Sequence, residues 1–300
     1  MTTNLVLVHA LSPIHCGTGQ AISGIDLPIA RERSTGTPLI PGSTLKGVLR
    51  AQAGGYKPRP EGGTDRPEAL PEHLAAFGPE TANASDHAGS VQFADAHLLA
   101  LPMRSVRGTV AWVTSPHLLR RLRRDLAEAK LDWPLPTAPT SEKGALVASD
   151  RLKVKVGNVE KVVLEDFDFE VQPSKEVGAF AEALGKAIFG GAAKDEIQHL
   201  RDRLCVVGDD AMRVLVRTGM EVTARNRIDP DTHTVAKGAL WTEEALPAET
   251  ILAGSLLATP VLRDFAPKAL LDHVRKLAKG PIQLGGKATV GRGLCRVEVL

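Results

Sequence analysis

Cysteine and aromatic residues are scarce in this chain of 300 residues. The cysteines, Cys16, Cys205 and Cys295, lie far apart and form no CxxC pair. This argues against a disulfide framework and a thiolate zinc site, and it is typical of a protein from the reducing cytoplasm. Aromatic residues make up only 4% of the sequence and no RNP-type aromatic motif is present, so base stacking on a sheet is a poor model for recognition of a nucleic acid.

Long apolar runs and a leader-like segment are also missing. No apolar stretch approaches membrane-spanning length, and the strand-like run NLVLVHAL (4–11) has neither a basic region before it nor a cleavage site after it. We therefore expect a cytoplasmic protein that is neither secreted nor inserted into a membrane.

Positive and negative residues are nearly balanced. The 37 Lys and Arg residues and 35 Asp and Glu residues leave a formal charge of +2, and 43% hydrophobic residues are enough to build a core. Attraction to RNA or DNA must therefore come from a local cationic patch rather than from the whole molecule.

What the chain does contain, at both ends, is small glycine-rich cationic loops beside short strands. They are SPIHCGTGQAISGIDLPIARE (12–32), GTPLIPGSTLKGVLR (36–50) and QLGGKATVGRGLCRVEV (283–299). Backbone amides exposed by glycine, a helix start and a few cations make a surface that holds phosphates without reading bases. We therefore predict a protein that binds a nucleic-acid backbone largely independently of sequence.

The predicted backbone-binding residues come from these loops, from a helix that starts after Pro41 and from a hairpin. In the helix, Ser43 or Thr44 is placed to cap the N-terminus, and Lys46 and Arg50 share one face, where they either reach a ligand or are solvated surface cations. The complete predicted set is Gly17, Gly19, Ser43, Lys46, Arg50, Arg225, Arg227, Gly285, Gly286, Lys287 and Arg292.

Two loops resemble nucleotide-binding motifs but lack residues that those motifs require. The loop GGKATVGRG (285–293) resembles a Walker A loop only superficially, because Arg292 replaces the lysine and a strand rather than a helix follows. The GTG at 17–19 lacks the third glycine and the following helix of a dinucleotide site. Neither an NTPase nor a Rossmann cofactor is indicated.

Residues that can perform chemistry are few. Asp26 lies between apolar Ile25 and Leu27, where its carboxylate either ligates a divalent cation, takes a proton from an RNA 2′-hydroxyl, or caps a turn. His15 is either a general acid or base or a hydrogen-bonding loop residue. Glu243 and Glu244 either complete a metal or proton-transfer site or are solvated.

One helix is predicted with particular clarity. In SPHLLRRLRRDLAEAK (115–130), Ser115 is placed to cap the helix, Pro116 takes its first position, and leucines at 118, 119, 122 and 126 form an apolar face. The arginines on the other side either meet RNA or a neighbouring subunit or, as is more usual, are solvated.

The order of predicted elements favours an α+β fold, a single domain over 1–300 built on a ferredoxin-like (RRM-like) βαββαβ core. Strand–helix–strand units at both chain ends supply this core, and a hairpin turns at Asp229-Pro230-Asp231. The Gly- and Pro-rich stretch 54–67 is expected to be a mobile loop. We place the core at about 1–53, 88–115 and 250–300, an insertion at 116–215 and the hairpin at 219–245.

Four segments resemble the backbone subunit of type III-B CRISPR Cmr effector complexes, a member of the RAMP superfamily. They are SPIHCGTG…IDLPIARE, TGTPLIPGSTLKGVLR, RIDPDTHTVAKGALWTEEALPAET and LGGKATVGRG. The glycine loop and PGSTLKG are shared by RAMP proteins generally, whereas IDLPIARE and GALWTEE point to the Cmr backbone subunit. Residues 54–215 contribute little to the resemblance.

The resemblance implies a ferredoxin-like RAMP palm with a protruding β-hairpin thumb. Copies would stack in a helical filament along a CRISPR guide RNA, together with other Cmr subunits, and cleave complementary target RNA at regular intervals. It further implies that Asp26 is the catalytic residue and binds Mg²⁺ or Mn²⁺, with His15 and Glu243 or Glu244 as accessory candidates. The implied chemistry is attack by the neighbouring 2′-oxygen.

Two alternatives stay open. One is a non-catalytic subunit that only coats the guide RNA. The other is a stand-alone RAMP endonuclease that trims precursor guide RNA without a metal, with His15 as its base.

Overall fold

The computed structural model describes residues 1–19, 24–57, 68–80, 83–259, 261–262 and 264–300. Most of the predicted mobile loop at 54–67 therefore lies outside the described residues. Within them the chain has a mixed α/β fold, in which thirteen strands join one sheet and two more form a separate hairpin. None of the described helices is both long and apolar enough to cross a membrane.

The centre of the large sheet is built from both ends of the chain. Five antiparallel strands lie in the order β14-β15-β1-β13-β4, so that the N-terminal strand is flanked by two strands from the C-terminal region. This arrangement brings the glycine-rich loops of the two chain ends together. The strands are β1 (Thr2–Ala10), β4 (Ala96–Ser105), β13 (Ile251–Ala258), β14 (Pro281–Gln283) and β15 (Leu294–Val299).

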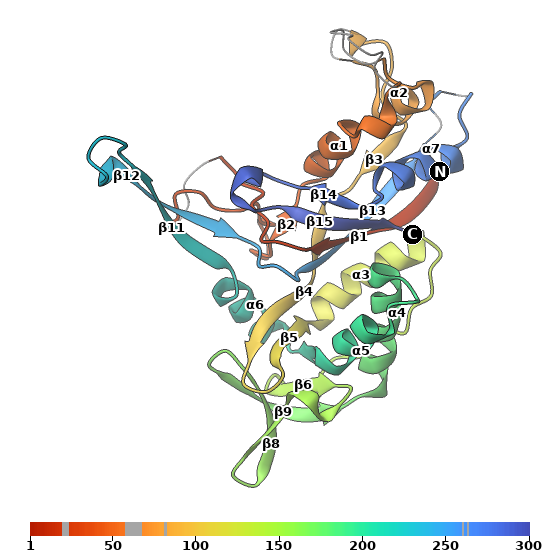
Figure 1. Ribbon diagram of the computed structural model, residues 1–300. Helices are drawn as coiled ribbons and strands as arrows, with labels where there is room; N and C mark the ends of the chain where they lie inside the picture. The colour runs from red at the N-terminus through yellow and green to blue at the C-terminus, as the bar shows by residue number, and fades with distance from the viewer. Residues whose placement is uncertain (20–23, 58–67, 81–82, 260, 263) are drawn as a thin grey trace.

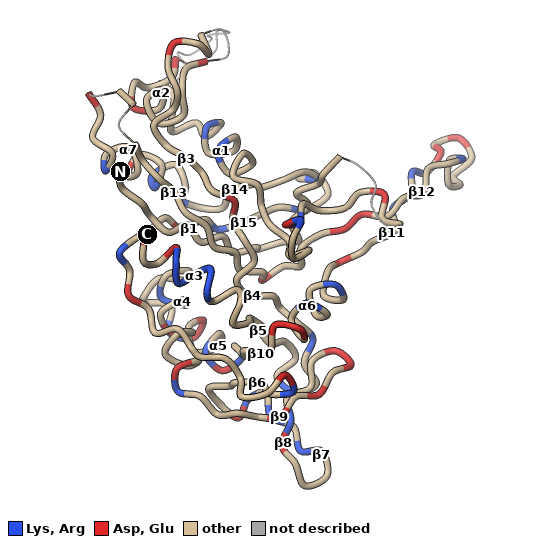
Figure 2. Tube along the Cα trace, turned by 180° about the vertical axis from the view of Figure 1, so that it is seen from behind, with Lys and Arg blue, Asp and Glu red and all other residues tan. Residues whose placement is uncertain are grey.

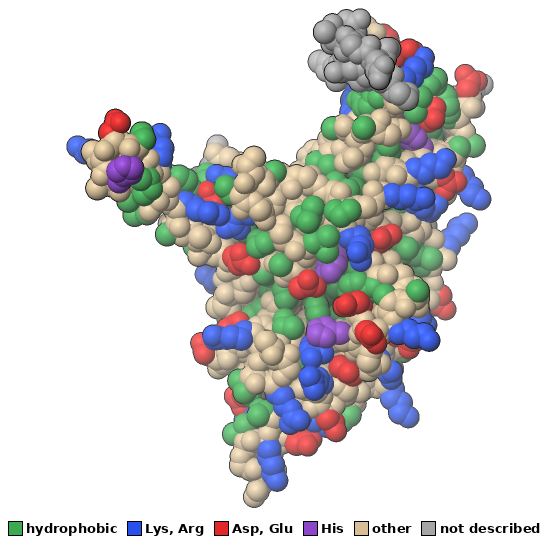
Figure 3. All heavy atoms as spheres, in the orientation of Figure 1, with side chains coloured by type: hydrophobic (Ala, Val, Ile, Leu, Met, Phe, Trp, Pro, Cys, Tyr) green, Lys and Arg blue, Asp and Glu red, His purple; other side chains and the backbone are tan. Residues whose placement is uncertain are grey.

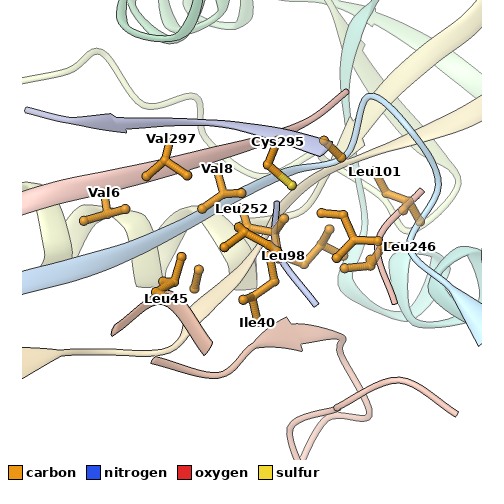
Figure 4. Close-up of a cluster of buried hydrophobic side chains, with 14 of the residues drawn as sticks. Val6, Val8, Ile40, Leu45, Leu98, Leu101, Leu246, Leu252, Cys295 and Val297 are labelled. Atoms are coloured by element: carbon orange, nitrogen blue, oxygen red, sulfur yellow. The ribbon is translucent and has the colours of Figure 1, made fainter. Parts of the chain in front are cut away.

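Helices cover both faces of this sheet, which explains the unbroken apolar run in β1. Val6 and Val8 pack in the core beside α1 and α7, whereas Leu5 and Leu7 pack beside α3 and α4 on the other face. Figure 1 shows these helices on opposite sides of the central strands, and Figure 4 shows Val6 and Val8 near Leu45 of α1. The helices are α1 (Gly42–Arg50), α3 (Pro116–Glu128), α4 (Lys175–Phe189) and α7 (Pro267–Leu277).

Helix α3 confirms the predicted leucine stripe and the place of Pro116. The four leucines are the buried residues of the helix, and Pro116 is in its first turn. Ser115 occupies the N-cap position, but its side chain makes no capping hydrogen bond. Arg120 and Arg121 form ion pairs with Asp209 and Glu32 of the same chain, Arg120 on the surface and Arg121 partly buried.

The region predicted as an insertion continues the same sheet. Strand β4 pairs with β5, and the order then runs β5-β10-β6-β9-β8-β7. Strand β5 (Thr109–Thr114) precedes this region, whose own strands are β6 (Gly144–Val147), β7 (Lys153–Val156), β8 (Val159–Leu164), β9 (Phe167–Pro173) and β10 (Leu204–Val207). Its further helices are α5 (Lys194–Arg203) and α6 (Asp209–Thr218).

The predicted capping of α1 was wrong. No side chain of Ser43 or Thr44 caps the helix. Instead, the backbone N–H of Gly42 donates to Oδ1 of Asp95, 53 residues away, at 2.8 Å. Asp95 is available because it lies in the break between strands β3 (Val91–Phe93) and β4. Near α1 lie the short strand β2 (Leu39–Ile40) and the helix α2 (Pro71–Phe77).

Strands β11 (Glu221–Ile228) and β12 (Val235–Ala245) form the separate antiparallel hairpin. Figures 1 and 3 show that its tip stands clear of the body of the protein and leaves a broad concave surface beside it. Apolar side chains are exposed along it, at Val222, Ile228, Val235 and Leu240. The base of this hairpin meets the loops from both chain ends.

Candidate functional site

Asp26 lies in a loop that is held against the base of the hairpin. In this loop, residues 24–29 and hereafter the Asp26 loop, the N–H of Leu27 donates to the carbonyl of Thr242 at 3.0 Å. The N–H of Glu244 in turn donates to the carbonyl of Leu27, also at 3.0 Å. The loop therefore adds a short parallel pairing to β12, which places Asp26 at the side of this strand.

The carboxylate of Asp26 is exposed, and its orientation is fixed by Thr242. Oδ2 accepts hydrogen bonds from the backbone N–H of Thr242 at 2.7 Å and from its hydroxyl at 2.9 Å. These two bonds, the backbone bond first, lower the pKa of Asp26 below its ordinary value. The side chain is therefore ionised at neutral pH, and Oδ1 accepts no hydrogen bond from another described residue.

His15 is buried behind the same strand. Its Nδ1 lies 2.7 Å from the carbonyl oxygen of Glu244. Because a carbonyl only accepts, Nδ1 carries the proton, and Nε2 of the neutral ring has a free lone pair. Nε2 faces Gly17, where an added Cβ would lie 2.8 Å from it. Glycine at position 17 therefore makes room for the ring.

The C-terminal glycine-rich loop, residues 284–293, packs directly on this histidine. The N–H of Gly286 donates to the carbonyl of His15 at 2.9 Å. Gly285 has φ +77°, and an added Cβ there would lie 2.4 Å from that carbonyl oxygen. Packing and backbone conformation therefore require glycine at 285, a structural reason that the sequence analysis did not assign.

Glu243 is the centre of a buried ion cluster that joins the hairpin to the glycine-rich loop. Its side chain is 3% exposed, and Oε1 accepts from Nζ of Lys287 at 2.9 Å and from the indole of Trp241 at 2.8 Å. Oε2 lies 3.5 Å from Nε of Arg225 and 3.9 Å from Nε of Arg292. Burial alone would raise the pKa of Glu243, but these bonds and charges lower it overall.

Arg292 lies inside this cluster rather than on the surface. Its side chain is 6% exposed, and Nη1 lies 3.9 Å from the carboxylate of Glu221. Within the described part of the chain, Nε and Nη1 of Arg292 and Nε of Arg225 have no hydrogen-bond partner. We call Glu243, Glu221, Arg225, Lys287 and Arg292 the Glu243 cluster. It combines three cations with two carboxylates and retains unused donors.

Glu244 points to the other face of β12 and binds the Asp26 side. Oε1 forms an ion pair with Arg31, and Oε2 accepts from the backbone N–H of Ile29 at 3.0 Å. Arg31 also donates to the carbonyl of Gly36 at 2.8 Å. Both oxygens of Glu244 are thus engaged in holding the segment that follows Asp26.

Not all predicted residues meet at this site. The guanidinium of Arg50 donates to the carbonyl of Pro79, and Ser43 is exposed on α1. Lys46 and Arg227 have no ion-pair partner among the residues that the structure describes. Gly19 has φ +76° and open space around it. Their roles in RNA binding stay predictions.

A cleft of about 830 Å³ borders the site. Its lining includes Ile25, Pro28 and Arg31 from the segment around Asp26, and from α6 both the cations Arg213 and Arg217 and the carboxylates Asp209 and Asp210. Basic and acidic segments are interspersed along the rest of the trace (Figure 2). The cleft, too, is therefore lined by both signs of charge.

Comparison with known proteins identifies the family. A sequence model of the RAMP superfamily matches residues 7–296. The chain belongs to the RAMP superfamily. This RAMP protein is 34% identical over 299 residues to the CRISPR system Cmr endoribonuclease Cmr4 of Pyrococcus furiosus, and the match covers 100% of this chain and 96% of the relative. It is therefore a homologue of Cmr4 along its whole length.

Solved structures agree with this assignment. The crystal structure of oligomeric Cmr4 from Pyrococcus furiosus matches this RAMP protein with a TM-score of 0.72 at 29% identity, covering 100% of this chain and 98% of the other. A cryo-EM structure of the type III-B Cmr-beta complex bound to cognate target RNA gives a TM-score of 0.73 at 21% identity, covering 100% and 97%. At that identity the second match supports the fold alone.

Sequence reasoning missed three residues of the site in this RAMP protein. Thr242 binds Asp26, Trp241 binds Glu243, and Glu221 faces Arg292. The segment GALWTEE was singled out for its resemblance to the Cmr backbone subunit, and only its two glutamates were weighed as site residues. Alternation along a strand places Thr242 and Glu244 on one face. No sequence signal, however, indicates that Thr242 contacts a residue 216 positions away.

Proposed function

We propose that this protein is the endoribonuclease backbone subunit of a type III-B CRISPR Cmr complex. Several copies bind along a guide RNA together with other Cmr subunits, and each copy cuts the complementary target RNA once, so that the cuts are regularly spaced. The observation that carries this proposal is the exposed, ionised Asp26 held beside a cationic hairpin base. The homology to a Cmr endoribonuclease over the whole chain supports it. The expected location is the cytoplasm.

The core is proposed to be a ferredoxin-like palm. In a βαββαβ fold the first and third strands lie in the middle of the sheet. The order β15-β1-β13-β4, with α1 after β1 and α7 between β13 and β15, supports that topology. On this reading residues 1–53, 88–115 and 250–300 form the palm, and 219–245 form the thumb.

The Glu243 cluster is proposed to contact the guide RNA backbone. It carries one more cation than carboxylates, and its partly exposed cations are Arg225 and Lys287, whose side chains are 34% and 33% exposed. A phosphate oxygen can accept charge-assisted hydrogen bonds from these two side chains at the surface. Backbone contacts of this kind leave the bases free to pair, so that base pairing supplies the sequence specificity.

Cleavage is proposed to proceed by attack of a target 2′-oxygen on the adjacent phosphorus. The bond from phosphorus to the 5′-oxygen breaks, which leaves a 2′,3′-cyclic phosphate and a 5′-hydroxyl. The proton of the 2′-hydroxyl passes to a base, and the leaving 5′-oxygen gains a proton. Because its pKa lies below the ordinary value, Asp26 is a poor proton acceptor at neutral pH, which favours an electrostatic or metal-binding role. Nε2 of His15 is the candidate proton acceptor.

The residues present fit a loosely held Mg²⁺ or Mn²⁺ but not a protein-built metal cage. Among the described residues no group of three or more His, Cys, Asp or Glu side chains is placed to hold a metal. Mg²⁺ commonly uses one or two carboxylates and completes its shell with water and substrate phosphates. Oδ1 of Asp26 would be the protein ligand. When bound, the ion would neutralise charge that develops on the phosphate.

The decisive experiment uses the assembled complex with guide RNA and labelled target. Asp26→Asn should abolish target cleavage while guide binding and subunit assembly stay intact. Wild-type products should carry cyclic phosphate ends, and EDTA should stop the reaction. Unchanged cleavage by Asp26→Asn would refute the assignment of Asp26.

The same assay separates the alternatives. A wild-type complex that binds target RNA without cutting it would identify a guide-coating subunit. Cleavage that persists in EDTA but disappears in a His15→Ala variant would favour the stand-alone endonuclease.

A further inference from the structure

Thr242 makes a reciprocal pair of hydrogen bonds with Asp26. Its hydroxyl donates to Oδ2 of Asp26 at 2.9 Å and accepts from the backbone N–H of Asp26 at 3.1 Å. Its own backbone N–H donates to the same Oδ2 at 2.7 Å. Only serine and threonine combine a donor and an acceptor in one side-chain atom so close to the backbone. The side chain at 242 is therefore matched to this contact.

Thr242 is itself fixed on a well-anchored strand. It pairs with Ala224 across the hairpin, and its carbonyl accepts from the N–H of Leu27. The next two residues are held on opposite faces of β12, Glu243 by Lys287 and Glu244 by Arg31. Asp26, by contrast, is exposed in a loop and has no other described side chain as a partner. The strand therefore determines where the loop carboxylate points.

We propose that Thr242 is a positioning residue, which fixes the Asp26 carboxylate in one orientation through Oδ2 and leaves Oδ1 without a hydrogen bond from the described residues. This inference rests on the catalytic role proposed for Asp26. The bond geometry carries it, because a carboxylate on an exposed loop would otherwise sample several rotamers. The contact also ties Asp26 to the hairpin, so that the carboxylate follows any movement of β12.

The test compares Thr242→Val with Thr242→Ser in guide-loaded complexes. Valine keeps the shape of threonine without the hydroxyl, and serine restores it. Partners that orient a metal-binding or catalytic side chain typically change activity by roughly 10- to 100-fold when removed. We expect a single-turnover cleavage rate lower by about that factor in Thr242→Val. Thr242→Ser should cut at close to the wild-type rate, and the affinity for target RNA should be unchanged in both variants.

A second readout does not depend on catalysis or on a metal. The N–H of Asp26 donates to the Thr242 hydroxyl, so its exchange with deuterium in EDTA should accelerate in Thr242→Val and not in Thr242→Ser. Thr218→Val is the matched control, because among the described residues the hydroxyl of Thr218 bonds only to carbonyls of its own helix. That variant should match wild type in both measurements.

The outcomes distinguish this inference from the proposed function. If Asp26→Asn is inactive but Thr242→Val cuts like wild type, Thr242 does not position Asp26, and the proposed function stands. If Thr242→Ser is as slow as Thr242→Val, or if either loses assembly or target binding together with cleavage, the hydroxyl has no positioning role. If Asp26→Asn still cuts, the proposed function itself is wrong.

Discussion

Glu243→Gln tests whether the buried ion cluster holds the hairpin to the body of the protein. The substitution keeps the shape of the side chain but removes the charge that faces Arg225, Lys287 and Arg292. Gln can still accept hydrogen bonds from Lys287 and Trp241. Its amide group, however, cannot balance the guanidinium of Arg292, whose side chain is 6% exposed.

The expected loss of stability follows from the burial of each partner. Removing one member of a buried ion pair typically costs about 3–5 kcal/mol because the other charge is left uncompensated. Arg225 and Lys287 are 34% and 33% exposed, so water screens part of their charge. Glu221 stays near Arg292 and offsets a further part. We therefore expect a loss at the lower end, about 3 kcal/mol in the free energy of unfolding.

Urea unfolding of the purified chain at pH 7, followed by circular dichroism, measures this loss. Glu182→Gln, which removes an exposed pair with Lys186 on α4, is the control and should hardly change the unfolding midpoint. The pH dependence of unfolding gives a second check. Because the pKa of Glu243 is lower in the folded than in the unfolded protein, the stabilisation by its carboxylate is present above the unfolded pKa and is lost as pH falls through the folded pKa. Glu243→Gln should therefore lose less stability on acidification than wild type. A variant as stable as wild type at pH 7 would refute the reasoning.

Three further predictions concern the surrounding structure. Gly285→Ala should destabilise the fold by at least about 1–2 kcal/mol, from the left-handed backbone alone. Gly157 also has a positive φ but lies in open surroundings, so Gly157→Ala should lower the free energy of unfolding less in the same urea titration. Equal losses in the two variants would contradict the packing argument. Burial lowers the pKa of His73 and His273 in the folded protein, so on acidification these residues are protonated first in the unfolded chain. Stability should therefore fall as pH drops below about 6.5. The midpoint of thermal unfolding should depend less on pH in His73→Asn than in wild type. Lys287→Ala should weaken guide RNA binding and reduce the slope of its logarithm against log salt by about 1; an unchanged slope would place Lys287 off the RNA.

Much of the local structure could be predicted because it depends on neighbours in the sequence. The stripe of leucines and Pro116 predicted α3, and two extended runs around Asp229-Pro230-Asp231 predicted the hairpin. The candidate site was predicted only as a set of residue types in loops at the two chain ends. That Asp26, His15 and Glu243 take part in one site was implied by the family resemblance and not by their spacing.

The sequence by itself determined which segments become strands and helices, that both faces of β1 are buried, and that glycine-rich loops from the two ends lie beside strands. These features arise from short-range periodicity and backbone preferences, which a single chain segment already contains. Only the tertiary structure decided that Asp95 rather than Ser43 caps α1, that Arg292 is buried against Glu221 and Glu243, and that Thr242 holds Asp26. Each of these contacts joins residues between 49 and 216 positions apart. A polar group pairs with whichever donor or acceptor the packing of the chain brings within reach. No local sequence pattern encodes that choice.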